Sequence, residues 1–228
     1  MRFRFAHALV AIGVSVALTL PALTAHAADD RAVAGQQVAI DHSHSHQQCL
    51  SPKAVQLQNE LRKLWAEHAL WTKSYIVAAL SNLESKNDVL ARLLRNQQDI
   101  GNAIKPYYGE AAGNKLAELF TEHIVIAGKL IDALQSGNQA EVQKLNKQWY
   151  DNADAIAAFL SGANPNWSQK QLKEMLDQHL QLVTAEVAAG MKKDSAGAIQ
   201  AFDQNLNHLM TLADTLAAGI VKQFPNHF

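Results

Sequence analysis

Apolar residues recur at helical spacing in the segment from residue 172 to residue 190, LKEMLDQHLQLVTAEVAAG. Successive residues of a helix are rotated by about 100°, so positions that share one face can be identified from their numbers. Here the apolar positions surround the direction of His179, and Glu186, about two turns further on, lies close beside that direction. These positions are Leu172, Met175, Leu176, Val183 and Val187. The pattern predicts an amphipathic helix with a histidine at the centre of its buried face.

Two earlier segments repeat this pattern. His123 stands 56 residues before His179, and His68 stands a further 55 residues before His123. Apolar residues surround both at the same angular positions: Leu61, Leu64, Trp65, Tyr75 and Ile76 in the first segment, and Leu116, Leu119, Phe120, Leu130 and Ile131 in the second. A repeat of this length that contains two helices is typical of stacked or bundled helical hairpins.

Capping residues, glycines and prolines divide residues 51–228 into helices. Ser51 followed by Pro52 is a typical helix start, and Pro106 is expected to end the second helix before it. No segment shows sustained β alternation. We therefore expect an all-α fold, a single helical bundle of about six helices built from three repeated αα-hairpins. The expected helices cover residues 51–80, 87 to before 106, 110–137, 138–161, 168–190, and 194 or 195 to before 225.

Residues 1–27 have the pattern of a signal peptide. Arg2 and Arg4 precede an apolar run over residues 8–20, and Ala25-His26-Ala27 is a small-x-small cleavage site. The apolar run is too short to span a bilayer comfortably. We expect cleavage after residue 27, which makes the protein periplasmic or secreted, with no transmembrane segment after cleavage.

The charge balance argues against nucleic acid as a partner. The formal net charge of the chain is −1, from 20 Lys and Arg against 21 Asp and Glu. Loss of the signal peptide removes two arginines, so the same count becomes 18 against 21, or −3. A mildly acidic chain without a cluster of Lys and Arg has no attraction for nucleic acid or for an anionic membrane surface.

Residues 28–50 are expected to form a flexible, polar segment rich in histidine. His42, His44 and His46 alternate with serine, so an extended chain would place the three imidazoles on one side. Imidazole nitrogens suit Zn, Cu or Ni, and a flexible tract can adapt its geometry to such an ion. The alternative interpretation is a disordered spacer, because a short tract without a preorganised site binds weakly.

Cys49 is the single cysteine of the chain, which excludes an intrachain disulfide. In an oxidising compartment an unpaired thiol is buried, serves as a ligand, or links two chains. Its polar surroundings disfavour burial. A dimer linked through Cys49 and a metal-binding role are therefore hypotheses beside the absence of any role.

The three repeated histidines form a second candidate site. If the hairpins close into a bundle, His68, His123 and His179 lie at similar heights and their rings can converge. With Glu186 as a fourth ligand and Asn152 as a supporting partner, they would suit Zn, Fe or Cu. The alternative is that each histidine hydrogen-bonds a neighbouring helix, and that the repetition reflects duplication of one hairpin. In an open solenoid the histidines would lie roughly 10 Å or more apart and share no site.

The sequence lacks several motifs of known metal and cofactor sites. Ferritin-like sites need Glu three residues before His, but Trp65, Phe120 and Leu176 occupy those positions here. There is no Cys-x-x-Cys-His for haem, no HExxH and no phosphate-binding glycine loop. The glutamates directly before two of the histidines, Glu67 and Glu122, point about 100° away from them and are expected to be solvated.

Polar residues of the last helix suggest a polar seam. Asp203 and Asp214 border its apolar stripe, and we expect them to pair with an arginine of the second helix, Arg92 or Arg95. His208 lies away from the stripe and is expected to be exposed.

Aromatic residues occupy two equivalent loops of the repeat. Tyr107 and Tyr108 follow Pro106, and Trp167 follows the Asn164-Pro165 turn. Such residues usually close the end of a bundle, and the alternative is the mouth of a ligand site.

The segments LLRNQQDIGNAIKPYYG, LTEHIVIAGKLI, QWYDNADAIAAFL, NPNW and QFPNHF resemble those of an uncharacterised family of small bacterial all-helical proteins. The resemblance covers roughly residues 61–228. It implies a compact helical domain and carries no activity, cofactor or site residue.

The sequence supports three functional hypotheses. The first is an exported, non-enzymatic helical protein that binds a transition metal or a small ligand through the core histidines. The second is a structural or interaction module that binds another envelope protein, with histidines used only for internal hydrogen bonds. The third is an enzyme in which one of these histidines acts as general base, which requires a pocket beside it.

Overall fold

The structure, a computed structural model, describes residues 50–228, which are all-helical with no strand. Capping side chains begin the helices where the sequence predicts: Ser51, Asn138, Ser168 and Asp194 each accept a hydrogen bond from the backbone N–H three residues on. The helices are α1 (Pro52–Leu80), α2 (Lys86–Ser136), α3 (Gln139–Ala163), α4 (Gln169–Met191) and α5 (Ser195–Gln223), followed by the short 3₁₀ helix η1 (Pro225–His227). Within this described range no helix is long and apolar enough to cross a membrane.

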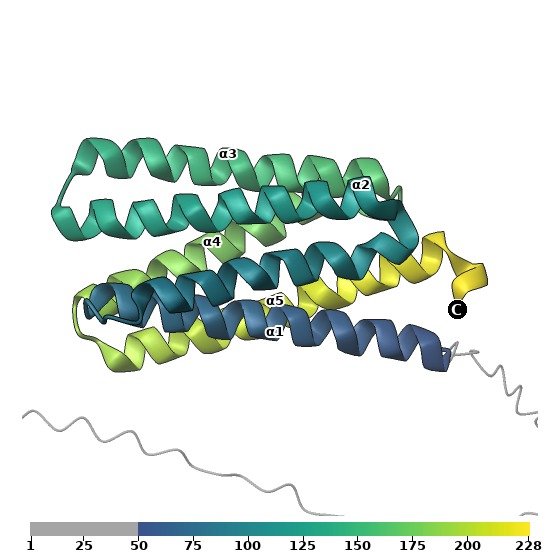
Figure 1. Cartoon of the computed structure of the whole chain (residues 1–228), viewed down its shortest axis with the longest axis horizontal. Helices are drawn as coiled ribbons and strands as arrows, with labels where there is room; N and C mark the ends of the chain where they lie inside the picture. The colour runs from purple at the N-terminus through teal and green to yellow at the C-terminus, as the bar shows by residue number, and fades with distance from the viewer. Residues whose placement is uncertain (1–49) are drawn as a thin grey trace, which may run out of the picture. The chain divides into compact units, whose positions relative to one another are not determined.

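Helix α2 reverses direction at Gly109. This residue has φ 82° and ψ 170°, a conformation open almost only to glycine. A Cβ atom on Gly101 would lie 2.5 Å from the carbonyl oxygen of Gly113, although these residues would be about 18 Å apart in a straight helix. In Figure 1 the first arm of α2 accordingly runs to the right and the second arm returns to the left.

The six separate helices expected from the sequence are therefore not observed in the described residues. Pro106 lies inside α2 and does not end it, and Gly109 is the residue with non-helical dihedral angles. Proline at an interior position removes one backbone hydrogen bond, but the chain remains helical past it because the reversal follows three residues later. The coarser prediction, an all-α helical bundle, is confirmed.

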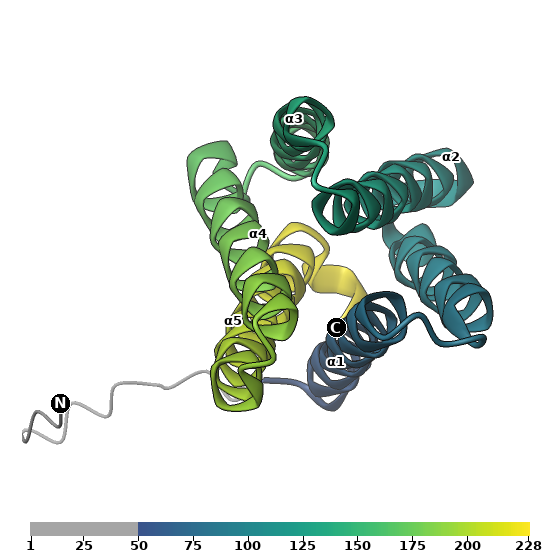
Figure 2. The same cartoon turned by 90° about the vertical axis from the view of Figure 1, so that its left-hand side faces the viewer.

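The helices close into a ring. Helix α1 packs on α2 and α5, α2 packs on α3, α3 on α4, and α4 on α5. Figure 2 shows this ring nearly end-on. Since every helix turns its apolar face inward, the central histidines of the repeated pattern meet inside the ring, and a stacked solenoid is excluded.

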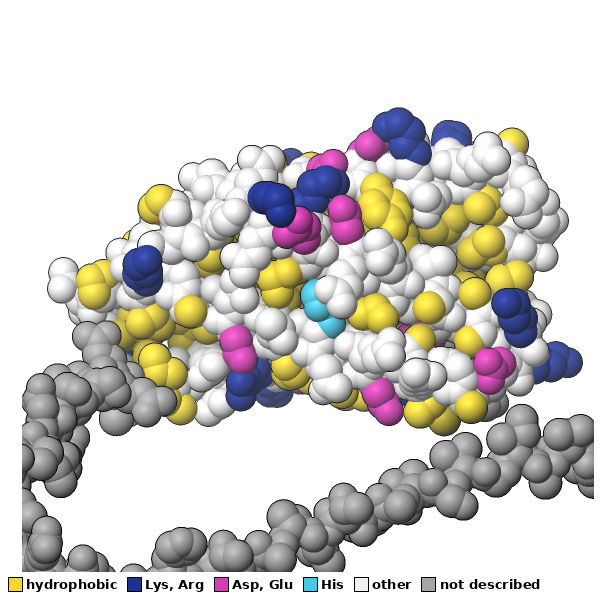
Figure 3. Space-filling model, turned by 180° about the vertical axis from the view of Figure 1, so that it is seen from behind, with side chains coloured by type: hydrophobic (Ala, Val, Ile, Leu, Met, Phe, Trp, Pro, Cys, Tyr) yellow, Lys and Arg dark blue, Asp and Glu magenta, His cyan; other side chains and the backbone are white. Residues whose placement is uncertain are grey.

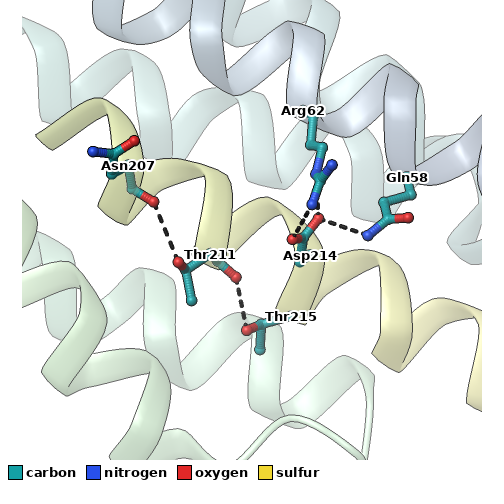
Figure 4. Close-up of polar contacts among 6 residues, drawn as sticks. All are labelled: Gln58, Arg62, Asn207, Thr211, Asp214 and Thr215. Carbon is teal, nitrogen blue, oxygen red and sulfur yellow. Dashed lines mark hydrogen bonds and ion pairs between the residues drawn. The ribbon is translucent and has the colours of Figure 1, made fainter. Parts of the chain in front are cut away.

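Polar contacts between the first and last helices join the ring on its surface. Arg62 of α1 donates two hydrogen bonds of 2.6 Å to the carboxylate of Asp214 of α5, and Gln58 donates a third of 2.8 Å (Figure 4). Asp214 therefore pairs with α1, and the prediction of an arginine from the second helix is wrong. Arg92 instead pairs with Glu67 at 3.0 Å. Exposed pairs of this kind contribute about 1 kcal/mol or less, so burial supplies most of the stability of this seam.

Aromatic side chains close one end of the bundle. The ring centroids of Tyr108 and Trp167 are 5.8 Å apart, and Tyr107 stacks on Phe228 at 5.7 Å. The Tyr108 hydroxyl donates to Gln223 at 2.8 Å, and burial raises its pKa to about 12. These contacts agree with the predicted closing role of the two loops.

Candidate functional site

Three histidines meet inside the ring. His68 from α1, His123 from α2 and His179 from α4 are 2–3% exposed. The ring centroids of His68 and His179 are 5.5 Å apart, and those of His123 and His179 are 6.2 Å apart. The indole rings of Trp65 and Trp149 pack against this group, which we call the histidine layer.

Each histidine of the layer contacts a side-chain amide through Nδ1. The Nδ1 atom of His123 lies 2.9 Å from Oδ1 of Asn152, and that of His179 lies 2.8 Å from Oδ1 of Asn205. An amide oxygen only accepts, so both histidines carry hydrogen on Nδ1 and leave Nε2 unprotonated when neutral. His68 lies 3.3 Å from Nε2 of Gln97, whose N–H donates to it.

These contacts tie neighbouring helices together. They join α1 to α2, α2 to α3, and α4 to α5. A buried ring nitrogen needs a hydrogen-bonding partner, and the amides provide one for each ring. This arrangement is what the hypothesis of structural histidines predicts. The sequence identified Asn152 as a partner but missed Gln97 and Asn205.

Burial keeps the histidine layer neutral. It lowers the pKa of His123 to about 3 and that of His179 to about 4, and the charge of a neighbouring histidine lowers both further. The pKa of His68 is also well below its usual range, chiefly through burial and then through His179 and His123. A general base works best with a pKa near the working pH, so these values do not favour the enzyme hypothesis.

The predicted core metal site gains no support from this geometry. Among residues 50–228 no group of three or more His, Cys, Asp or Glu side chains is arranged to hold a metal ion. Glu186, the expected fourth ligand, lies about 10 Å along the α4 axis from His179. The set His68, His123, His179 and Glu186 therefore stays a prediction. The tail histidines His42, His44 and His46, together with Cys49, lie outside the described residues.

Glu186 lines a separate pocket between α1, α4 and α5. The pocket has a volume of about 140 Å³. Its apolar walls include Ile76, Val77 and Leu80 of α1 and Ile199 of α5. The sequence indicated that Glu186 faces inward, but the walls come from distant parts of the chain, so no sequence pattern revealed the pocket.

The carboxyl group of Glu186 is buried without a partner. The side chain is 3% exposed, and no side chain or backbone group of residues 50–228 forms a hydrogen bond or ion pair with it. Burial raises its pKa to about 7, and nearby Lys73 acts in the opposite direction. The Lys73 ammonium lies 4.0 Å from the ring centroid of Phe202, a cation–π contact that holds it over that ring.

Two other cavities lack such a group. One of about 310 Å³ lies between α1 and the first arm of α2, beside Glu60, Asp99 and Tyr107. Glu60 is exposed there and Asp99 is half-buried. A second cavity of about 80 Å³, between α2, α3 and α4, is lined almost entirely by apolar atoms beside Trp149. The Glu186 pocket is therefore the strongest candidate site.

Replacing Glu186 with glutamine should change how stability depends on pH. A carboxyl whose folded pKa is raised from 4.5 to about 7 stabilises the fold below pH 4.5 and loses that contribution as pH rises through 7. The loss amounts to about 3 kcal/mol. We expect Glu186→Gln to be more stable relative to wild type at pH 8 than at pH 5, as measured by urea unfolding. The control is Glu174→Gln, an exposed position of the same helix, and an equal difference at both pH values would contradict the buried state of Glu186.

His208 takes a different place from the one predicted. It is half-buried, and its Nε2 atom donates a hydrogen bond of 2.7 Å to the carbonyl oxygen of Met175. The prediction of an exposed side chain was wrong because α4 packs over this side of α5.

Comparison with family models, curated proteins and solved structures gave no match for this chain. The resemblance to an uncharacterised bacterial family therefore remains a prediction.

Proposed function

We propose that this chain is an exported, non-enzymatic helical-bundle protein that binds a small ligand in the Glu186 pocket. The observation that carries the proposal is a carboxyl group, 3% exposed and without a partner in the described residues, on the wall of a pocket of about 140 Å³. Buried charged groups are normally paired, and an unpaired one beside a cavity is a frequent mark of a binding site. The histidine layer acts as internal architecture in this proposal.

The rim of the pocket supports ligand entry. Val77 and Ile199, which both line it, are 49% and 53% exposed, so apolar surface continues from the pocket to the outside. An apolar wall with a single polar group is the usual composition of a small-molecule site. The face of the molecule in Figure 3 shows positive and negative side chains interspersed, which agrees with the absence of nucleic acid from the proposal.

Export and tail metal binding rest on the sequence alone. Residues 1–27 and the tail histidines lie outside the described residues, and their patterns are the support for both. A partner protein of the cell envelope remains an alternative function.

The proposal is tested by fragment binding measured with nuclear magnetic resonance. The probes are neutral, acidic and amine fragments of about six non-hydrogen atoms, since a cavity of about 150 Å³ holds benzene. Binding should shift the amide signals of Ile76, Val77 and Ile199. Ala198→Phe should fill the pocket and abolish these shifts, whereas Ala196→Phe, an exposed position on the same helix, should leave them unchanged. Absence of any fragment binding at these residues would refute the proposal.

A further inference from the structure

We infer that the Glu186 pocket takes a small primary alkylammonium ion, with its ammonium group on the unpartnered Glu186 carboxylate and its alkyl chain against Ile76, Val77 and Leu80. The inference rests on the proposed function and specifies the chemical class of the ligand.

The charge of the site favours a cation. A carboxylate out of water without a partner is unfavourable, because neither charge pairing nor hydrogen bonding compensates its loss of hydration. An ammonium group brings both a positive charge and three N–H donors to the acceptor oxygens. An alcohol of the same size brings one uncharged donor, and a carboxylate brings like charge. Of these head groups, the ammonium group gains most from Glu186.

Lys73 does not take the place of the ligand. Its ammonium group lies over the ring of Phe202 at 4.0 Å and forms no ion pair with Glu186. The Glu186 carboxylate therefore keeps its acceptor atoms available on the pocket side. Because Lys73 lines the same pocket, a zwitterion with a carboxylate of its own is the competing ligand that the experiment must include.

The volume limits the alkyl chain. A pocket of about 140 Å³ is close to the size of a cavity that holds benzene, a molecule of six non-hydrogen atoms. Pentylammonium has the same number of non-hydrogen atoms. Its chain would lie against side chains that carry no polar atoms, and longer chains would pass the rim at Ile199.

Proton linkage gives the site a second signature. An ammonium ion binds the ionised form of Glu186, whose pKa is about 7 in the free protein. Affinity should therefore fall as the pH decreases below 7, by roughly 30-fold between pH 8 and pH 5.5. The amine itself stays protonated over this range, so the change reports the carboxyl group of the protein.

The test is calorimetric titration of the full chain with four probes of similar size: pentylammonium, 1-pentanol, pentanoate and norvaline. Pentylammonium should bind wild type roughly tenfold or more tightly than the other three. Glu186→Gln should abolish this preference, and Ala198→Phe should abolish binding. The pH dependence of wild type provides a readout that needs no variant.

Three outcomes separate the inference from the function it rests on. Equal or tighter binding of pentanol, pentanoate or norvaline at the same pocket would overturn the ammonium assignment and leave the proposed function intact. Pentylammonium binding that survives in Ala198→Phe, or that does not weaken at pH 5.5, would overturn the assignment as well. Failure of all four probes and of the fragment screen would refute both.

Discussion

Lowering the pH from 6.5 to 4 is expected to remove about 5 kcal/mol of folding free energy through His123 and His179 together. Their folded pKa values are about 3 and about 4, against 6.5 for an ordinary histidine. In this window the unfolded chain binds protons that the folded protein excludes, so protonation favours unfolding. The contribution is complete above pH 6.5 and is lost as the pH falls toward the folded values.

The measurement is urea unfolding at half-unit pH steps, for wild type and His179→Gln. Glutamine can still donate to Asn205 but does not titrate, so the variant should lose much less stability in acid. His227→Gln, at an exposed position, should behave as wild type. Glu186 acts in the opposite direction between pH 4.5 and 7, so the comparison is repeated in Glu186→Gln. An unchanged acid profile in His179→Gln would mean that surface carboxylates control acid unfolding.

Replacing Gly219 with alanine is expected to destabilise the fold by about 2 to 3 kcal/mol. Gly219 lies in α5 directly against the indole ring of Trp167, and a Cβ atom there would overlap the ring, at 2.7 Å from its Cε2. Trp167 is 4% exposed and donates a hydrogen bond to the Thr215 carbonyl, so it has little room to move. The better helix propensity of alanine offsets about 1 kcal/mol of the strain at most.

Thermal and urea unfolding of Gly219→Ala would measure this effect. The matched control is Gly162→Ala in α3, where a Cβ atom meets nothing within 4 Å. That variant should be slightly more stable than wild type, by about 0.5 to 1 kcal/mol. Stability of Gly219→Ala equal to that of the control would show that the indole ring can shift away, and that this end of the bundle is loosely packed.

The helices could be predicted largely from local chemistry. Periodicity places the apolar faces, and Ser51, Asn138, Ser168 and Asp194 begin helices because their side chains satisfy free backbone N–H groups. The course of α2 could not be predicted in this way. Its reversal depends on close backbone contact between two glycines that lie 12 residues apart, which no local rule describes.

The candidate site was predictable only in part. The repeat identified the three histidines and Asn152, but whether the rings meet depends on closure of the ring of helices. The repeat aligns Asn96 with Asn152, whereas the amide that contacts His68 belongs to Gln97. Glu186 was placed on the buried face correctly. Its significance follows from the pocket walls, which α1 and α5 provide.

Closure of the ring between α1 and α5 has a consequence for the newly made chain. The contacts of Asp214 with Gln58 and Arg62 join residues 156 and 152 positions apart. Until α5 has been synthesised, the apolar sides of α1 and α4 that it covers have no partner. The bundle can therefore become complete only after translation has nearly ended, and a shortened chain that stops before α5 leaves an open groove in contact with water, a substrate for chaperones and proteases.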